Sequence, residues 1–303
     1  MSGAIDVSVV LAVYNETGHV RDEILRIRRA LDASPYSFEI IVVDDGSSDG
    51  SIDELEGLPN LDVIRLSTNR GSGVARKLGT QSARGRVVVW TDVDMSYPNE
   101  EIPRLVKELD GYDQVVGART SEQGSHKLLR VPAKWVIRKL ASFLVEQPIP
   151  DLNSGYRAFR RDVGAQFLHL VPNGFSNVST MTITFLANGY AVKYVDIDYR
   201  PRAGKSKFRP WRDTRLYIGQ VVRMALSYNP LRIFAPIGSL FLLAGLGLLA
   251  HDWVDDGTFH VATSTLLVLL TAVQIFAVGL LADLVVRATK PRLDVEPATL
   301  RRH

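Results

Sequence analysis

The sequence predicts an α/β fold: a Rossmann-like domain with a mainly parallel sheet, followed by a juxtamembrane amphipathic helix and a two-helix transmembrane hairpin. Short apolar runs that end in polar loops alternate with helical patterns at intervals of roughly 25–30 residues, which is typical of βαβ units. A basic stretch follows near residues 211–229 of the 303-residue chain. Beyond it come two runs without Asp, Glu, Lys or Arg, at 233–250 and 261–282.

The strands of the sheet are predicted from short apolar runs. These runs occupy residues 7–13, 38–43, 61–66 and 87–90, and helical patterns follow the first and third of them at 19–31 and from 72 to about 83. Three of the strands end in polar, turn-forming loops, which begin near Tyr14, Asp44 and Thr91. Ligands of such sheets bind beyond the carboxyl ends of the strands, so we expect these loops to line one cleft.

Asp92 and Asp94 follow the fourth predicted strand with one residue between them. Side chains at i and i+2 of an extended chain point to the same side, so the two carboxylates share a face. One interpretation is a polar cap where a buried strand reaches water. The other is a seat for Mg²⁺ or Mn²⁺, which take carboxylate oxygens together with substrate phosphates. The polar loops at other strand ends favour the second interpretation.

Gly71-Ser72-Gly73 raises the alternative of a dinucleotide-binding loop. The third glycine of that pattern would stand at position 76, which is an arginine. The favoured interpretation is a tight turn into a helix whose N-terminus faces the cleft.

Composition excludes several classes of site. The chain has no cysteine, so disulfides, zinc thiolate sites and cysteine nucleophiles are ruled out. Its six histidines are not at metal-ligand spacing. Lys+Arg of 36 against Asp+Glu of 33 gives a net charge of +3, too mild to indicate a nucleic-acid partner.

A second group of residues suggests a site for a phosphate. Arg130, Lys134 and Arg138 recur every four residues and share one helix face, and Arg119 follows another predicted strand end. They fit a phosphate ligand, or else a solvated basic face. Asp151 is either a carboxylate beside that ligand or an N-terminal helix cap.

The two apolar runs predict a membrane hairpin, with buried core helices as the alternative. At about 1.5 Å per residue the runs reach about 27 and 33 Å, enough to cross a bilayer core. The connector between them holds three aspartates and no Lys or Arg, whereas basic residues flank the hairpin, so both outer ends are predicted to be cytoplasmic. The stripe of Arg212, Arg215 and Arg223 suits a helix in the membrane interface, or else ordinary domain packing. The predicted domains are 1–210, 211–229, 230–287 (spans at about 233–250 and 261–285) and a cytoplasmic tail at 288–303.

Five motifs carry a resemblance to a known family. AVYNE (12–16), VVDDGSSDG (42–50), NRGSGVARKLG (69–79), TDVDMSYP (91–98) and DLNSGYRAFRRDV (151–163) resemble family 2 glycosyltransferases of the GT-A fold. Within that family they look like the polyprenyl-phosphate branch, which includes dolichyl-phosphate mannose synthase and bacterial undecaprenyl-phosphate glucosyltransferases.

The resemblance implies roles for individual residues. Asp94 and Asp151 would be the catalytic carboxylates, and the lipid phosphate would be bound by Arg119, Arg130 and Lys134. A metal would be held by Asp92, Asp94 and Ser96, where Ser96 replaces a frequent glutamine and is the weaker ligand. Ala12 stands where the family usually has proline. The nucleotide-sugar site would comprise Ala12, Tyr14, Glu16, Val43, Asp45, Asp92, Val93, Asp94, Arg202 and Lys207.

The predicted function is inverting, metal-dependent transfer of a hexose from a nucleotide sugar to a polyprenyl phosphate at the cytoplasmic leaflet of the inner (plasma) membrane. UDP-glucose or a related UDP-hexose is favoured as donor, with GDP-mannose next, and Mg²⁺ or Mn²⁺ as cofactor. The resemblance also allows a homo-oligomer. One alternative is a processive polysaccharide synthase, for which Gln220-Val-Val-Arg223-Met224 is an incomplete motif. The other is a non-catalytic membrane scaffold that binds nucleotide sugars.

Overall fold

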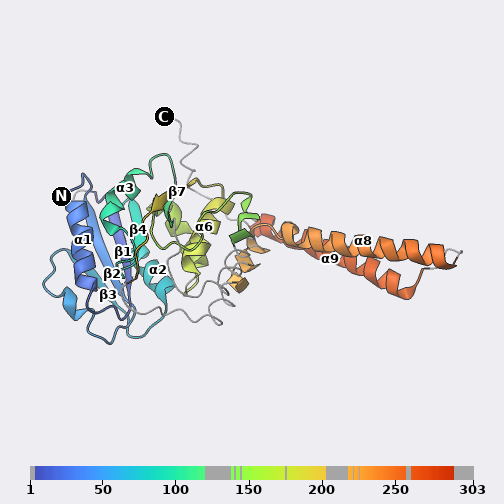
Figure 1. The fold of residues 1–303 in the computed structure, drawn as a ribbon, viewed down its shortest axis with the longest axis horizontal. Helices are drawn as coiled ribbons and strands as arrows, with labels where there is room; N and C mark the ends of the chain where they lie inside the picture. Colours follow the sequence, from blue (N-terminus) through green and yellow to red (C-terminus); the bar gives the residue numbers. More distant parts are fainter. Residues whose placement is uncertain are drawn as a thin grey trace. The chain divides into compact units, whose positions relative to one another are not determined.

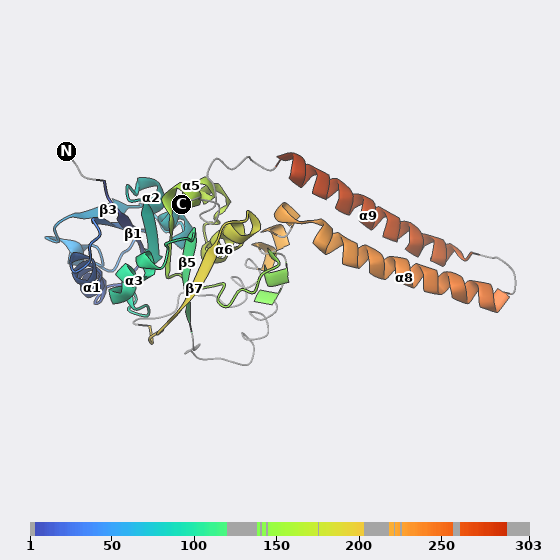
Figure 2. The same cartoon turned by 90° about the horizontal axis from the view of Figure 1, so that it is seen from above.

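The computed structural model describes residues 4–119, 138–139, 141–143, 145–174, 176–202, 218–220, 222–224, 226–256 and 261–289 (Figures 1 and 2). The chain divides into two compact units at the boundary between residues 220 and 221. Each unit is described by itself.

The first unit is built on a seven-stranded sheet with the order β3-β2-β1-β4-β6-β5-β7. The prediction of a mainly parallel sheet is confirmed, with β6 as the antiparallel exception between β4 and β5. The strands are β1 (Val7–Val13), β2 (Phe38–Asp44), β3 (Leu61–Arg65), β4 (Val87–Thr91), β5 (Gln114–Arg119), β6 (Arg157–Arg160) and β7 (Val192–Ile197). The helices of this unit are α1 (Val20–Asp32), α2 (Ser72–Ser82), α3 (Ile102–Lys107), α5 (Arg161–Gln166) and α6 (Asn177–Ala187), with short 3₁₀ turns at η1 (Asp53–Leu55), η2 (Asn99–Glu101) and η3 (Leu168–Leu170).

Helices cover both faces of the sheet, which is why its central strands are continuous apolar runs. On one face, alternate residues of β1 form a core with Ile24 and Ile27 of α1 and with Ile102 of α3 (Figure 1). On the other face α2 approaches so closely that a side chain at Gly79 would meet Val10 of β1.

The strand ends that carry the predicted site residues lie at one edge of the sheet. The parallel strands β1, β2, β4, β5 and β7 end there. Because β6 runs antiparallel, with Trp90 opposite Arg157 and Val87 opposite Arg160, its amino end lies at the same edge. Residues 151–156, which lead into β6, therefore arrive beside the loops that leave the other strands.

The second unit is a hairpin of α8 (Leu231–Asp256) and α9 (Thr263–Thr289). Phe276 packs on Gly238 and Leu269 on Gly245, so the helices run antiparallel. Both are long and apolar enough to cross a membrane, with mean hydropathies of 2.2 and 2.4 over their apolar parts. They extend beyond the predicted spans 233–250 and 261–285, except that α9 starts two residues later. The Asp252 carboxylate accepts hydrogen bonds from the Ala262 amide and the Thr265 hydroxyl, which joins the last turns of α8 to the start of α9.

The predicted juxtamembrane helix at 211–229 lies partly outside the described residues. Residues 218–220, 222–224 and 226–228 are helical. Its interfacial position stays a prediction, as do the domain boundaries and the tail at 288–303.

Candidate functional site

The loops that follow β1 and β2 are bonded together at the functional edge. The Asn15 amide donates to Ser47 Oγ at 3.0 Å, and the Ser48 amide donates to Asn15 Oδ1 at 2.9 Å. Asn15 has φ +50°, a left-handed conformation that asparagine tolerates. The Glu16 amide donates to Ser51 Oγ at 2.7 Å. These two motifs therefore form one surface, as expected from their positions at strand ends.

Asp45 connects this surface to the start of α2. Its carboxylate accepts the amide hydrogens of Arg70 at 2.7 Å and Gly71 at 2.8 Å. Gly71 precedes the helix with φ +98°, where a side chain would be strained and would collide with the Asn173 carbonyl. Burial raises the pKa of Asp45 despite these bonds. The predicted contact with base or ribose would have to share oxygens that already hold the loop.

The remaining predicted nucleotide residues lie at the same edge. Ala12 and Val43 are ladder partners near the ends of β1 and β2, and Tyr14 follows in a half-buried position. Val43 and Val93 are buried, so any contact they make with a nucleotide would come from the backbone. Glu16 Oε2 contacts His19 Nε2 at 2.8 Å.

Asp92 is held by a buried arginine that the sequence analysis did not select. Arg76 of α2 donates from Nη2 to Asp92 Oδ1 at 2.7 Å and from Nη1 to Asn177 Oδ1 at 2.6 Å. Its guanidinium lies 5.4 Å from the centre of the Trp90 ring. The Arg76 side chain is 5% exposed and that of Asp92 is 34% exposed, so the carboxylate keeps access to a ligand.

Asp94 is buried and held by two neighbours. Arg202 Nη2 contacts Asp94 Oδ2 at 2.7 Å, which brings together two residues predicted for the donor site. The Ser96 hydroxyl and amide both donate to Asp94 Oδ1. Burial and the nearby charge of Asp92 raise the pKa of Asp94, against the opposing effect of Arg202.

The pair suits a divalent cation that is shared with a substrate. Asp92 and Asp94 are close enough for the charge of one to disfavour ionisation of the other, and a bound cation would relieve that repulsion. No group of three or more His, Asp or Glu side chains suited to hold a metal occurs in the described part of the chain. Oxygens from a substrate phosphate or from water would therefore complete the coordination, as is usual for Mg²⁺. The Ser96 hydroxyl donates its hydrogen to Asp94, but the lone pairs of its oxygen could still make a weak contact with a cation.

Arg119 and Asp151, both predicted for the acceptor side, form a pair with each other. Arg119 donates from Nε and Nη2 to the two oxygens of Asp151 at 2.7 and 2.9 Å. The Asn153 amide donates to Asp151 Oδ1 at 2.9 Å. The alternative of a helix cap is wrong, because an Asx turn and then strand β6 follow Asp151. Burial alone would raise the pKa of Asp151, but the hydrogen bonds and charge of Arg119 hold it below its usual range.

Two aromatic rings flank this pair. The Arg119 guanidinium lies 5.3 Å from the centre of the Tyr199 ring, and Tyr199 packs edge-on against Tyr97. Tyr97 stacks on Tyr156, and its hydroxyl accepts the Gly155 amide hydrogen at 2.8 Å. The segment before β6 is thus joined to the segment that carries Asp92 and Asp94.

Asp151→Asn is expected to destabilise the protein by about 1–2 kcal/mol at pH 7, since it removes an ionised partner of two hydrogen bonds. The folded state lowers the pKa of Asp151, so its contribution is present above the unfolded pKa of about 3.9 and is lost as pH falls further through the folded pKa. Urea unfolding of both proteins at pH 7, 5 and 3 measures this. A stability difference that grew towards pH 3 would contradict the pairing.

Three predicted site residues, Arg130, Lys134 and Lys207, lie outside the described residues. Of the same basic face, Arg138 donates from Nη1 to the Pro150 carbonyl at 3.2 Å, next to Asp151.

The sequence analysis missed Arg76, Tyr97, Tyr199 and a buried network behind Asp92. In that network Asn99 donates to Glu23 Oε1 at 2.5 Å and to the Asp92 carbonyl at 3.1 Å. A signal for Arg76 was present: it lies three residues from both Gly73 and Gly79, on the face of the helix that must approach the sheet closely.

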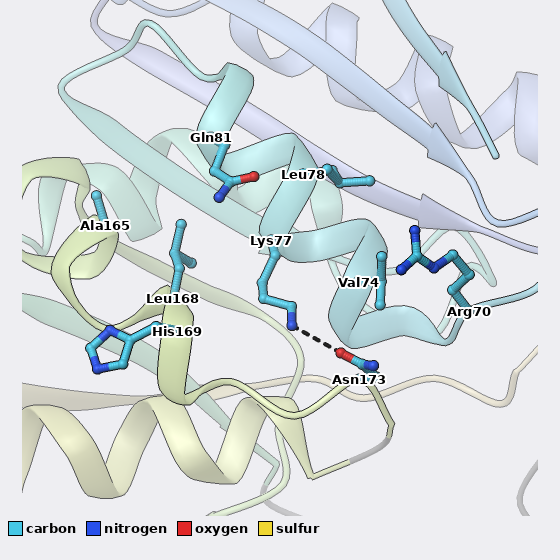
Figure 3. A pocket seen from close by; sticks show the side chains of 9 residues that line it. All are labelled: Arg70, Val74, Lys77, Leu78, Gln81, Ala165, Leu168, His169 and Asn173. Carbon is cyan, nitrogen blue, oxygen red and sulfur yellow. Dashed lines mark hydrogen bonds between the residues drawn. The ribbon is translucent and has the colours of Figure 1, made fainter.

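A pocket of about 480 Å³ lies between α2 and the α5–η3 segment (Figure 3). Lys77 donates to Asn173 Oδ1 at 2.9 Å across it. None of the predicted site residues is among its lining residues, Arg70, Val74, Lys77, Leu78, Gln81, Ala165, Leu168, His169 and Asn173.

Comparison with known families gives two matches. Residues 8–166 match Glycosyl transferase family 2. Residues 229–288 match the GtrB C-terminal hairpin. The two matches fall on the sheet domain and on the α8–α9 hairpin, respectively.

Curated relatives match over nearly the whole chain. An undecaprenyl-phosphate 4-deoxy-4-formamido-L-arabinose transferase of Aeromonas hydrophila subsp. hydrophila is 31% identical over 304 residues, covering 93% of this chain and 88% of the relative. A protein of the same name from Pseudomonas fluorescens strain ATCC BAA-477 is 32% identical, covering 96% of this chain and 89% of the relative.

Solved structures show the same fold at lower identity. Glucosyl-3-phosphoglycerate synthase from Mycobacterium tuberculosis, in complex with Mn²⁺, UDP and phosphoglyceric acid, has a TM-score of 0.59 and 20% identity, covering 73% of this chain and 78% of that one. Its complex with Mg²⁺ and UDP gives a TM-score of 0.57 with 18% identity, covering 73% and 79%.

Proposed function

The chain belongs to glycosyl transferase family 2, and from this premise we propose that it transfers a sugar from a UDP-linked donor to undecaprenyl phosphate. The observation that carries the proposal is the meeting of two charged groups at one sheet edge. One is the Asp92–Asp94 pair with its arginines, and the other is the Arg119–Asp151 pair. A transferase needs a donor and an acceptor side by side, and these groups supply a position for each.

The donor diphosphate binds at Asp92 and Asp94 in this proposal. These two residues would hold Mg²⁺ or Mn²⁺, with Ser96 as a weak third contact. The bound cation would neutralise charge that develops on the departing nucleoside diphosphate. Arg202 lies against Asp94 and is a third exposed, so it can contact a diphosphate oxygen from the same place.

The acceptor phosphate binds near Arg119. Asp151 takes up the Nε and Nη2 hydrogens of Arg119 and fixes the orientation of its guanidinium, which leaves Nη1 for a phosphate oxygen. Asp151 is a poor general base, because its pKa is held low. None is required, since the acceptor phosphate is already anionic near neutral pH. In-line attack by its oxygen on the anomeric carbon inverts that centre.

The identity of the sugar has two candidates with separate support. A UDP-hexose such as UDP-glucose is favoured by the resemblance of the two-helix hairpin to that of bacterial glucosyltransferases, and the structural neighbours include complexes with UDP-glucose. The curated relatives are named for 4-deoxy-4-formamido-L-arabinose, a pentose derivative. UDP is favoured over GDP as the nucleotide of the donor, because the solved neighbours were crystallised with UDP or UDP-glucose. The sugar named for the curated relatives is compatible with a UDP-linked donor.

In this proposal the hairpin anchors the enzyme in the inner membrane, with the sheet domain and the C-terminal tail in the cytoplasm. The acidic connector and the basic flanks support this orientation. A membrane-impermeant maleimide should label Trp253→Cys from the outside of intact cells, and labelling only after lysis would reverse the orientation.

Transfer is tested with the full chain in membranes, undecaprenyl phosphate, Mn²⁺ and one radiolabelled donor at a time. The panel contains UDP-glucose, UDP-galactose, UDP-4-deoxy-4-formamido-L-arabinose and GDP-mannose. We expect one labelled lipid product that carries a single sugar and is lost with EDTA. A ladder of polymer would support a processive synthase instead. Absence of product from every donor would contradict the proposed activity.

A further inference from the structure

We propose that Glu23 is a positioning residue for the cation of the donor site. It acts through Asn99, whose side chain holds the main chain of the loop that carries Asp92 and Asp94. The inference rests on the proposed function, because the cation at these two aspartates belongs to that proposal. It does not depend on which sugar is transferred.

The loop that carries the aspartates has a main-chain conformation that needs support from its surroundings. Met95, directly after Asp94, has φ +60°. A residue with a Cβ atom disfavours this left-handed conformation, because the Cβ atom comes too close to the following carbonyl oxygen. Such a conformation persists only where neighbouring structure holds it. The contacts around the loop therefore determine where the two carboxylates stand.

Asn99 supplies one of these contacts. Its side chain is fully buried; Nδ2 donates to the Asp92 carbonyl at 3.1 Å, and Oδ1 accepts the Thr91 hydroxyl hydrogen at 2.5 Å. The second Nδ2 hydrogen goes to Glu23 Oε1 at 2.5 Å. The reverse orientation of the amide would set its oxygen against two other acceptors, the Asp92 carbonyl and the Glu23 carboxylate. Glu23 thus fixes the orientation in which Asn99 can hold Asp92.

Glu23 is buried at a place where no substrate contact explains it. It lies in the first turn of α1 and has no exposed surface. Within the described ranges its carboxylate forms hydrogen bonds with Asn99 and Arg26 alone. A buried carboxylate is costly unless it is paired and bonded. Holding Asn99 in place is a role that accounts for its position.

Arg26 completes the connection between α1 and the loop. Its Nη2 group donates to Glu23 Oε1 at 2.6 Å and to the Tyr97 carbonyl at 2.6 Å. The helix therefore holds the loop at two points, near Asp92 through Asn99 and at Tyr97 through Arg26. Since Arg26 also supplies the counter-charge, the Glu23 carboxylate can stay in place as a fixed acceptor.

Glu23→Met tests the inference in a way that does not require turnover. Methionine fills similar space but removes the acceptor that orients Asn99. We expect the affinity for Mn²⁺ in the presence of UDP to fall by about 10–100-fold, the usual loss when a group that supports metal ligands is removed. The full chain in detergent is titrated with Mn²⁺, and the electron paramagnetic resonance signal of free Mn²⁺ reports binding.

Glu23→Gln should restore the binding. Its amide oxygen can still accept from Asn99 and Arg26, so the affinity for Mn²⁺ should stay within about threefold of wild type. Its NH₂ group would stand where Glu23 Oε2 lies, a buried position without a hydrogen-bond partner in the described part of the chain, so the thermal midpoint should fall. Loss of Mn²⁺ affinity in Glu23→Gln as large as in Glu23→Met would contradict the proposed role of the acceptor.

Glu39→Met is the matched control for a general loss of stability. Glu39 is 7% exposed, lies near the amino end of β2, and accepts hydrogens from Ser8 and Arg84. It is therefore a buried, bonded glutamate at the sheet edge opposite the aspartates. The control should lower the thermal midpoint and leave the affinity for Mn²⁺ unchanged. Equal losses of affinity in Glu39→Met and Glu23→Met, or no loss in Glu23→Met, would overturn the proposal.

Asn99→Ala provides a second route that the fold should tolerate better, because water can enter the vacated space and bond to the groups around it. It also removes the hold on the Asp92 carbonyl and should weaken Mn²⁺ binding. Because Glu23 acts through Asn99, adding Glu23→Met to Asn99→Ala should weaken binding no further. Fully additive losses would overturn this route of action.

Transfer assays on the same proteins separate the inference from the proposed function. If Mn²⁺ affinity depends on Glu23 as expected but wild type transfers no sugar from any donor, the proposed function fails alone. If wild type forms the labelled lipid and Mn²⁺ affinity is insensitive to Glu23, the inference fails alone.

Discussion

Asp94→Asn is expected to lower kcat/KM for sugar transfer by about 10²–10³-fold, the usual size of losing one preorganised electrostatic contact to the transition state. The substitution keeps the size and shape of the side chain but removes one of the two charges that would hold the cation. It also removes the charge that keeps Arg202 in place. Initial rates at saturating acceptor, measured over a range of Mn²⁺ concentrations, give the loss and any shift in metal requirement.

The fold is expected to tolerate Asp94→Asn. The Asp94 carboxylate is 3% exposed and lies near Asp92, so an ionised group there is unfavourable in the absence of a cation. A neutral amide can still accept from Ser96, and Arg202 has access to water. We therefore expect the thermal midpoint without metal to be unchanged or higher.

Asp62→Asn is the matched control for Asp94→Asn. Asp62 lies on β3, its side chain is 60% exposed, and its contact with Arg84 is long at 3.4 Å. The control removes the same charge from the same protein and should retain full activity. If Asp94→Asn kept more than a tenth of wild-type activity with its metal requirement unaltered, Asp94 would not be part of the donor site.

The sequence predicted the sheet because its first four strands are apolar runs, three of which end in polar, turn-forming loops. It did not predict β6 and β7 as separate strands. β6 is only four residues long and reads Arg-Ala-Phe-Arg, with Arg157 buried. Burial and the nearby charge of Arg76 lower the pKa of Arg157 to about 10, and carbonyl groups of Ser154 and Val178 accept its hydrogens. Such a strand depends on tertiary contacts, which local patterns do not encode.

The sequence also did not predict which side chains of the site form hydrogen bonds with each other. The motifs indicated that Asp92, Asp94, Arg119 and Asp151 would lie at strand ends. They did not indicate that Arg119 and Asp151 would bond to each other, because these residues are 32 positions apart and meet only through the antiparallel placement of β6. In our proposal Asp151, which the resemblance made a catalytic carboxylate, orients Arg119 through these hydrogen bonds.

Arg76→Met is expected to give the largest loss of stability among these variants, about 2–4 kcal/mol at pH 7. Methionine fills much of the space of the arginine stem beside Trp90, so the loss isolates the guanidinium. Without it, the fully buried Asn177 side chain loses its 2.6 Å donor and Asp92 loses its counter-charge. The partial exposure of Asp92 keeps the cost below that of a fully buried ion pair, because water can reach its carboxylate.

A double-mutant cycle separates the two partners of Arg76. In the Asp92→Asn background the carboxylate charge is already gone, so Arg76→Met should cost less by about 1–2 kcal/mol, within the range found for residues in direct contact. Arg76→Lys keeps the charge but cannot reach Asp92 and Asn177 together, since only the guanidinium has donors in a fork. It should therefore lie between wild type and Arg76→Met in stability. Its KM for the donor should rise more than its kcat falls, because a displaced Asp92 weakens donor binding. Strictly additive costs would show that Arg76 does not position Asp92, and that its role is confined to joining α2 with α6.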